Sequence, residues 1–445
     1  MSTQTRYSTP DVPDVPANAA QDTRNRVALV AMTAIFFMWG FITELNGVLI
    51  PHLQSVFQLT HARSMLLDSA FFGAYFVMAV PAGRVVARVG YKLGIVIGLL
   101  VAGAGALLVL PAAQMASFNL FLPALFILAS GIVLLQVSAN PYVSLLGAPS
   151  RAASRLNFAQ AVNSLGHTLG PYVAGALIFS ATLLSADQLA ALPAAERVQT
   201  VQPLYIGVAA ALIVLALAVY FFRMPALTEA TEQADRQHHT FAEVLRHPHV
   251  RWGVLAIFFY VGVEVTVAHF MVTYVSRPEI GAMAEGKASL YLSMYHGAAM
   301  IGRFVGAALL LSANPRRLLP AYAAINIGLL LTTMFTAGGA AMWSVVAVGL
   351  FNSIMFPTIF TLAIERLGPM TEKASSLLVM AIVGGAVIPP LQGWFVDLFK
   401  TATGNETQAL QYAFFVSALC YAYIVWYGLR GSRLTSAGAL AQGQG

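Results

Sequence analysis

Residues 93–113 read LGIVIGLLVAGAGALLVLPAA, a stretch without a single charged or hydrogen-bonding side chain. At about 1.5 Å of rise per residue, roughly 20 apolar residues in a helix cross the ~30 Å hydrocarbon core of a bilayer. A surface helix of a soluble protein has one polar face, and a fully buried helix is usually shorter. The stretch therefore predicts a helix that spans a membrane.

Similar apolar stretches recur along the whole chain, and we count twelve of them. They are 27–50, 67–87, 93–113, 119–146, 156–181, 201–222, 252–275, 288–311, 319–338, 342–364, 374–398 and 408–429. In lipid, backbone amides must be paired within a segment or within a closed barrel, and barrel strands are shorter and alternate in polarity. We therefore expect an all-α membrane protein with twelve transmembrane helices.

The overall composition agrees with this class and excludes others. Hydrophobic residues make up 58% of the chain and charged residues only 9%, whereas a soluble protein has about 25% charged residues. The single cysteine, Cys420, has no partner for a disulfide or a cysteine-based metal site. No phosphate loop or nucleophile motif is present. We therefore expect neither an enzyme nor a bound cofactor or metal.

Basic residues indicate the topology. Most of the 24 Lys and Arg residues, Arg303 among them, fall on one face of the predicted membrane protein, in short loops rather than in a patch for nucleic acid. Because loops rich in Lys and Arg stay in the cytoplasm, both termini are expected on the cytoplasmic side of a bacterial inner membrane. Residues 1–26 are predicted to be a disordered tail and 430–445 a second cytoplasmic tail.

Internal repetition divides the chain. The sequence AIFF occurs at 34–37 and again at 256–259, and Gly-Arg at 83–84 returns at 302–303. The predicted parts are an N-terminal six-helix half (27–222), a cytoplasmic linker (223–251) and a C-terminal six-helix half (252–429). His238 and His239 of the linker lack a cysteine or nearby carboxylate, so we expect a solvated loop and no metal. Two repeated halves favour transport by alternating access.

Polar side chains inside the spans mark the candidate site. Amides both donate and accept hydrogen bonds, as sugar hydroxyls do, and aromatic rings stack on pyranose faces. Binding of an anionic substrate would require Arg or Lys within the spans, and we predict that no Arg or Lys lies in the middle of a span. Amides that merely join helices are the competing interpretation. The predicted sugar-binding residues are Trp39, Asn46, Gln136, Asn140, Asn157, Gln160, Asn163, Tyr260, His296 and Asn352, with Tyr142 and Tyr295 as further aromatic candidates.

Two carboxylates lie well inside the spans, Glu44 and Glu264. An intramembrane acid is costly and is usually functional, so each is a candidate proton carrier. The alternatives are that one of them hydrogen-bonds the sugar, or pairs with His269 or His296 as a structural lock. His167 is a further candidate for proton relay.

Several motifs resemble the fucose and glucose/galactose proton-symporter family of the major facilitator superfamily. They are LNGVLIP at 45–51, SANPY at 138–142, LNFAQ at 156–160 and FPTIF at 356–360. The resemblance extends through nearly all spans and implies the major facilitator fold. Glu264 is similar to the span-seven glutamate of the glucose/galactose branch, which this chain resembles more than the fucose branch.

Departures from the family pattern occur at its acidic positions. Gly47 stands where the fucose branch has an aspartate, and Gln136 stands where it has a glutamate. The family's gating loop is matched by a glycine-and-basic pattern, while Ala87 replaces its usual aspartate. The residues of this predicted gating loop are Gly83, Arg88, Gly90 and Lys92.

Together these features predict a monomeric transporter in the lipid bilayer that imports a hexose with protons. Glucose or galactose is the expected substrate, and fucose or an N-acetylhexosamine stays open. Because the acids at positions 47 and 136 are missing, an uncoupled facilitator is the first alternative. An exporter of drugs or metabolites and a sensor without flux are the others.

Overall fold

Helices are the only regular structure in the residues that the computed structural model describes, which are 19–58, 61–182, 194–225, 239–283 and 285–434. The longer ones are α1 (Ala19–Phe57), α2 (His61–Gln114), α3 (Phe118–Leu145), α4 (Ala152–Thr182), α7 (Gln202–Phe221), α10 (Pro248–Val275), α11 (Glu285–Leu309), α12 (Pro315–Phe335), α13 (Gly338–Asn352), α16 (Gly384–Thr403) and α17 (Glu406–Trp426). The shorter ones are α6 (Ala194–Gln199), α9 (Phe241–Arg246), α14 (Met355–Ala363) and α15 (Thr371–Met380).

Each of the twelve predicted spans lies largely on helical residues. The second and third spans both fall in α2, and Gly90 separates them with φ of 78° and ψ of 170°. This positive φ suits glycine, which has no Cβ to clash with the backbone. The tenth span is divided into α13 and α14, and the eleventh into α15 and α16. The fold class was thus correctly predicted, while the breaks within two spans were not.

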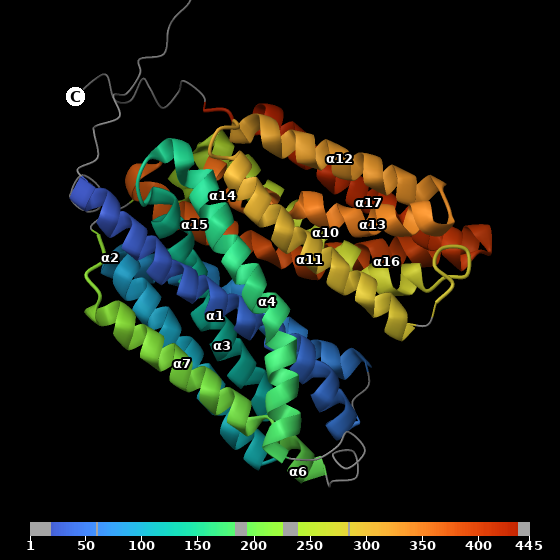
Figure 1. Cartoon of the computed structure of the whole chain (residues 1–445), viewed down its shortest axis with the longest axis horizontal. Helices are drawn as coiled ribbons and strands as arrows, with labels where there is room; N and C mark the ends of the chain where they lie inside the picture. The colour runs from blue at the N-terminus through green and yellow to red at the C-terminus, as the bar shows by residue number, and fades with distance from the viewer. Residues whose placement is uncertain (1–18, 59–60, 183–193, 226–238, 284, 435–445) are drawn as a thin grey trace, which may run out of the picture.

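Two of the long helices, α4 and α11, carry polar residues along their length. Among the described residues, nine helical segments are long and apolar enough to cross a membrane, and one of them, Ala70–Gln114, contains two predicted spans. Helices α4 and α11 do not meet that standard, because polar residues interrupt their hydrophobic sequence. They pack against each other and lie on the face of the molecule nearest the viewer in Figure 1. Their outward faces carry exposed apolar side chains such as Phe158, Ile301 and Val305.

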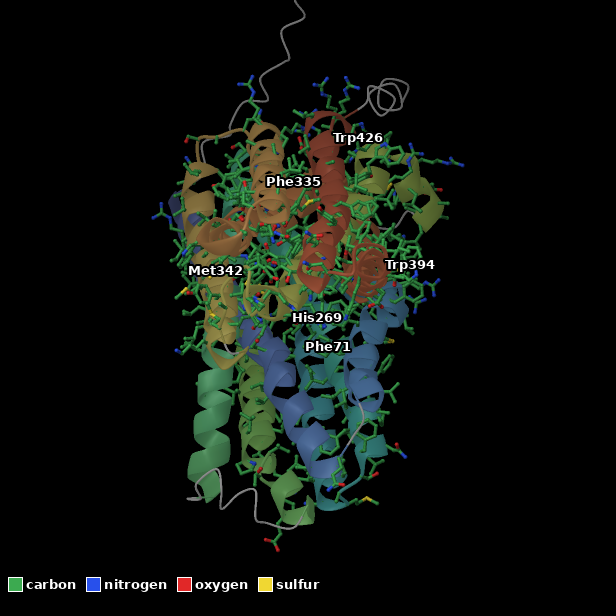
Figure 2. All side chains as sticks on the ribbon, turned by 90° about the vertical axis from the view of Figure 1, so that its right-hand side faces the viewer. Phe71, His269, Phe335, Met342, Trp394 and Trp426 are labelled. Carbon is green, nitrogen blue, oxygen red and sulfur yellow. The ribbon has the colours of Figure 1, made fainter. Side chains whose placement is uncertain are left out.

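The helices form two bundles. Helices α1 to α7 pack mainly on one another and form the N bundle, and α10 to α17 form the C bundle. Contacts between the bundles join α4 to α11 and α14, and join α2 and α3 to α15. The bundles meet at one end and diverge toward α6 and α16 (Figure 1). Seen from the diverging end in Figure 2, Phe71 and His269 lie at the boundary between them.

Close contacts hold the bundles together at the end where they meet, called the closed end below. The hydroxyl of Ser154 in α4 donates a 2.7 Å hydrogen bond to the backbone oxygen of Ala307 in α11. Gly83 of α2 faces α15, where a Cβ added to it would lie 2.7 Å from the Cβ of Ser376. A larger residue than glycine at position 83 would therefore push the bundles apart at the closed end.

Two predictions about the segments outside the spans were wrong. Residues 19–26 belong to α1 and are not a disordered tail, while residues 1–18 lie outside the described part. At about 1.5 Å per residue, a helix of 39 residues is much longer than the hydrocarbon core is thick, so its first turns can extend into water.

The described end of the linker is also more ordered than predicted. Thr240 and Glu243 form a capping box that begins α9, and His239 lies 3.2 Å from the Glu243 carboxylate. The hydrogen bond from the Thr240 backbone amide holds the pKa of Glu243 below its usual value. A carboxylate does accompany one linker histidine, contrary to expectation, whereas His238 lies outside the described residues.

Candidate functional site

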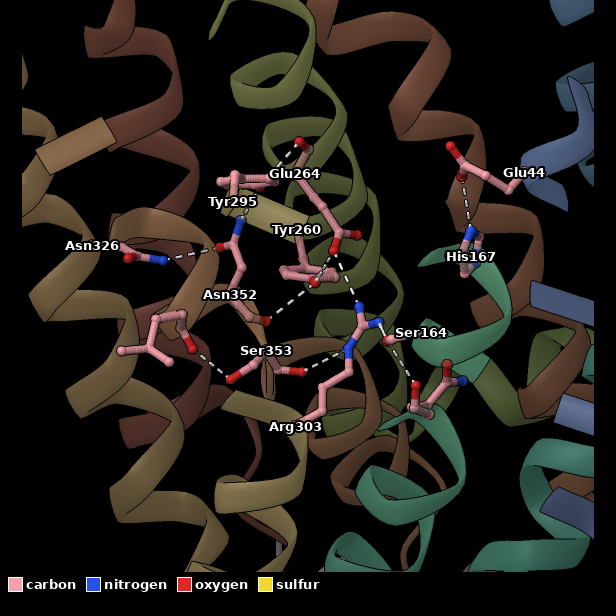
Figure 3. Close-up of polar contacts among 12 residues, drawn as sticks. Glu44, Ser164, His167, Tyr260, Glu264, Tyr295, Arg303, Asn326, Asn352 and Ser353 are labelled. Carbon is pink, nitrogen blue, oxygen red and sulfur yellow. Dashed lines mark hydrogen bonds and ion pairs between the residues drawn. The ribbon is translucent and has the colours of Figure 1, made fainter. Parts of the chain in front are cut away.

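The acid of the first predicted span pairs with a histidine of α4. Glu44 Oε2 lies 3.0 Å from His167 Nδ1, and each side chain is about a third exposed, at 34% and 32%. Two glycines allow α1 and α4 to approach this closely: a Cβ on Gly166 would lie 2.2 Å from the Phe37 backbone oxygen, and one on Gly170 would lie 3.2 Å from the Cβ of Glu44. The Glu44–His167 pair, drawn in Figure 3, is therefore built into the packing of the N bundle.

The acid of α10 has a different partner. Glu264 Oε1 lies 3.3 Å from an Arg303 guanidinium nitrogen and accepts a 2.8 Å hydrogen bond from the Tyr260 hydroxyl. Arg303 also donates a 3.3 Å hydrogen bond to the backbone oxygen of Ser353. Its side chain is 14% exposed. The expectations that no arginine lies within the spans, and that Arg303 belongs to a cytoplasmic face, were wrong.

Arg303 also links the bundles. Its guanidinium donates a hydrogen bond to the hydroxyl of Ser164 in α4, so one arginine contacts a carboxylate of its own bundle and a hydroxyl of the other (Figure 3). Sequence reasoning missed this link, although Arg303 falls well inside the predicted span 288–311. That position was the available signal, since an arginine in a membrane span needs a polar partner there.

Behind the ion pair lies a network centred on Asn352. Its amide nitrogen donates to Tyr295 at 2.8 Å, and its amide oxygen accepts from Asn326 at 3.0 Å and from Tyr421 at 2.5 Å. Its backbone oxygen accepts from Tyr260 at 3.2 Å. Because both heteroatoms of the Asn352 side chain are engaged and the residue is fully buried, it offers no free group to a ligand in this conformation.

Two of the predicted amides of the N bundle also hold helices together. Asn163 donates a 2.8 Å hydrogen bond to the Phe36 backbone oxygen in α1. Asn157 donates to the Ala153 backbone oxygen at 2.8 Å and contacts the Thr358 hydroxyl of the C bundle at 3.4 Å. The competing interpretation, in which amides join helices, therefore holds for these donor groups.

Other amide atoms lack a partner. Gln136 donates to the Tyr75 hydroxyl at 2.9 Å, but its amide oxygen accepts nothing. Among the described residues, both amide heteroatoms of Asn140, the Asn157 oxygen and the Gln160 nitrogen are likewise buried without a hydrogen bond. Buried polar groups are normally satisfied, so these unpaired atoms on α3 and α4 indicate where a polar ligand or water would bind.

The remaining predicted binding residues are spread more widely. His296 of α11 is exposed and lies within electrostatic range of both Glu44 and His167. Trp39 is buried, with its ring 5.3 Å from that of Phe36. Asn46 lies on α1, but its side chain is outside the described part.

Three further candidates are Tyr142, Tyr295 and His269. The Tyr142 hydroxyl donates to the Pro225 backbone oxygen at 3.2 Å. Tyr295 is buried in the Asn352 network. His269 is exposed at the boundary between the bundles, and it does not pair with Glu264.

The residues of the predicted gating loop lie on or beside the break in α2. Gly90 forms the break, Arg88 is exposed just before it, and the Lys92 ammonium lies 5.9 Å from the centre of the Tyr220 ring. Gly83 instead contacts the C bundle at the closed end. The loop therefore adjoins the part of α2 that packs on α15.

Comparison with known proteins defines the class of this chain. The sequence profile of the Major Facilitator Superfamily matches residues 28–390. The chain aligns with the crystal structure of the Escherichia coli fucose:proton symporter in the outward conformation, with a TM-score of 0.80 and 33% identity over 93% of this chain and all of the other. The protein is a transporter of the major facilitator superfamily, as the motifs predicted.

Its relatives identify the family more closely. The chain is 44% identical to the glucose/galactose transporter of Brucella abortus, over 91% of this chain and 94% of the relative. It is 34% identical to the L-fucose-proton symporter of E. coli, over 92% and 94%. The chain belongs to the family that contains these glucose/galactose transporters and fucose–proton symporters, which confirms the predicted resemblance.

Proposed function

We propose that this protein imports a hexose, glucose or galactose in the first place, together with protons. The observation that carries the proposal is the set of unpaired buried amide atoms on α3 and α4. Amide oxygens and nitrogens at such positions match hydroxyl groups, which donate and accept at once. The greater identity to the glucose/galactose transporter than to the fucose symporter supports the choice of sugar.

The proposed sugar site is centred on Gln136, Asn140, Asn157 and Gln160 of the N bundle, and His296 of α11 is proposed to contribute from the C bundle. Trp39 and Asn46 of α1 are proposed to complete it. We assign Asn163, Tyr260 and Asn352 to the support of this site, because their polar groups bond neighbouring helices.

The proposed transport cycle is a rocking of the N bundle against the C bundle, with Gly83, Arg88, Gly90 and Lys92 beside the moving contact. We place the closed end in the cytoplasm of a bacterial inner membrane, together with both termini, because the predicted loops on that face carry most of the basic residues. The transporting unit is proposed to be a monomer in the bilayer.

An uncoupled sugar facilitator is the second candidate function. Gly47 and Gln136 carry no ionisable group, so protons would have to bind elsewhere, and Glu44 and Glu264 are the proposed positions.

Transport of radiolabelled sugars into proteoliposomes tests these alternatives. Glucose or galactose is expected to exchange with unlabelled sugar and, with an inward proton gradient, to accumulate. Fucose, mannose and N-acetylglucosamine serve as competing substrates in parallel assays. Exchange without accumulation would identify a facilitator, and a lack of exchange of every sugar would contradict sugar transport altogether.

A further inference from the structure

The two intramembrane acids differ in the chemistry of their partners. Glu264 faces a guanidinium, which stays protonated under all physiological conditions. A proton on Glu264 would therefore leave Arg303 without its counter-ion. Glu44 faces the imidazole of His167, and imidazole in general can exist in a neutral and a protonated form, unlike a guanidinium. Of these two intramembrane pairs, Glu44–His167 is the one that can change its charge without leaving a fixed charge unpaired.

Building on the proposed sugar symport, we propose that Glu44 and His167 together hold the transported proton. Glu264 stays ionised as the permanent counter-ion of Arg303 and carries no proton. The two acids, which the sequence does not distinguish, therefore have different roles.

The packing of the helices supports this division. Glu44 and His167 both belong to the N bundle, where Gly166 and Gly170 hold α1 and α4 in close contact. The pair therefore stays intact when the bundles rock, and only its access to water changes. The bond from Arg303 to Ser164 joins different bundles, so it is one of the contacts that rocking breaks.

The proton balance of a cycle is simple. One proton from the water at the open side binds the pair, and the charge of the pair rises by one unit without any other bond being made or broken. Sugar binds, the bundles rock, and the same proton leaves to the water on the opposite side. The proton lies between His167 Nδ1 and Glu44 Oε2, which are 3.0 Å apart, so both residues bind it together.

The charge of the Glu44–His167 pair also affects the C bundle through His296 of α11. His296 of α11 interacts electrostatically with Glu44 and His167, and also with Glu264 and Arg303. An added positive charge on the pair changes the attraction between α4 and this part of α11. A proton therefore favours one arrangement of the bundles over the other through a differential interaction.

Accumulation and exchange in proteoliposomes separate proton coupling from sugar movement. One proton per sugar and a gradient of about one pH unit drive up to about tenfold accumulation. In Glu44→Gln, labelled glucose or galactose is expected to reach only the outside concentration, because the ~1.4 kcal/mol of the proton gradient no longer drives uptake. Counterflow exchange needs no gradient, so its rate is expected to stay within about twofold of wild type. Glu243→Gln is the matched control, because it alters a histidine–carboxylate pair outside the spans and keeps the helix cap.

Two more variants make the result specific to this pair. Glu264→Gln is expected to slow accumulation and exchange in parallel, since it disturbs the Arg303 link and not the proton. His167→Gln keeps a hydrogen-bonding group but cannot bind a proton, so the pH at which exchange is half-maximal is expected to shift by about one unit or more. A purely structural His167 would change the rate and leave the pH profile in place.

Accumulation that survives in Glu44→Gln, or that is selectively lost in Glu264→Gln, would overturn the inference while sugar symport stands. A wild-type protein that exchanges sugar but never accumulates it would overturn the symport itself. If Glu44→Gln fails to fold, as judged by its elution in detergent, an unchanged pH profile in His167→Gln overturns the inference instead.

Discussion

A disulfide between positions 154 and 307 is expected to abolish sugar transport while sugar binding persists. The Ser154 hydroxyl lies 2.7 Å from the Ala307 backbone oxygen, so α4 and α11 approach each other closely at the closed end. In the double variant Ser154→Cys, Ala307→Cys, an oxidant would fix α4 to α11. The bundles could then no longer separate there, and transport should fall at least about tenfold, since one covalent bond blocks the rocking that alternating access requires.

The measurement compares uptake before oxidation, after oxidation, and after reduction with dithiothreitol, which should restore transport. The background is favourable, because the single native cysteine, Cys420, is buried in α17. Each single-cysteine variant serves as a control and should transport sugar after oxidation. Sugar flux that continues through a fully cross-linked protein would show that the contact between α4 and α11 does not open during transport.

Replacing Arg303 by methionine is expected to destabilise the protein and to reduce transport strongly. The variant Arg303→Met keeps most of the side-chain length but leaves Glu264 facing Tyr260 without a cation. Removing one partner of a fully buried ion pair costs about 3 to 5 kcal/mol, and we expect about 2 to 3 kcal/mol here because both side chains retain some exposure. A lower midpoint of thermal unfolding in detergent would report the loss.

A second substitution distinguishes the ion pair from other contacts of Arg303. In Arg303→Met with Glu264→Gln, no unpaired carboxylate remains, so much of the stability should return although the cross-bundle link stays lost. Ser164→Ala removes only that link and should alter transport more than stability. Equal instability of the single and double variants at 303 and 264 would mean that the carboxylate is not the cause.

Much of the fold could be predicted because hydropathy is a local property. The run at 93–113 is apolar whatever surrounds it, and a chain in lipid has few ways to form the hydrogen bonds of its backbone. Breaks inside spans depend on neighbours, however. The interruption between α13 and α14 lies at residues that pack across from α11, where Gly302 leaves no room for a Cβ beside Ser353.

For the candidate site, the sequence indicates the individual polar residues and not the pairs that they form. Glu44, Glu264 and the amides stand out in sequence because a polar group in an apolar span is costly and therefore conspicuous. Their partners do not stand out. His167 lies far along the chain from Glu44, and Arg303 was counted with the loop charges although it falls inside a predicted span.

The sequence by itself determined the membrane class, the helices, the superfamily and the presence of two acids within the spans, since each depends on the kind of residue at a position. Only the tertiary structure decided which acid meets an imidazole and which meets a guanidinium. That choice follows from how closely α1 approaches α4 at Gly166, and from the placing of α11 between α10 and α4. Whether a carboxylate keeps or releases a proton depends on the charge a few ångströms away, which sequence position alone does not give.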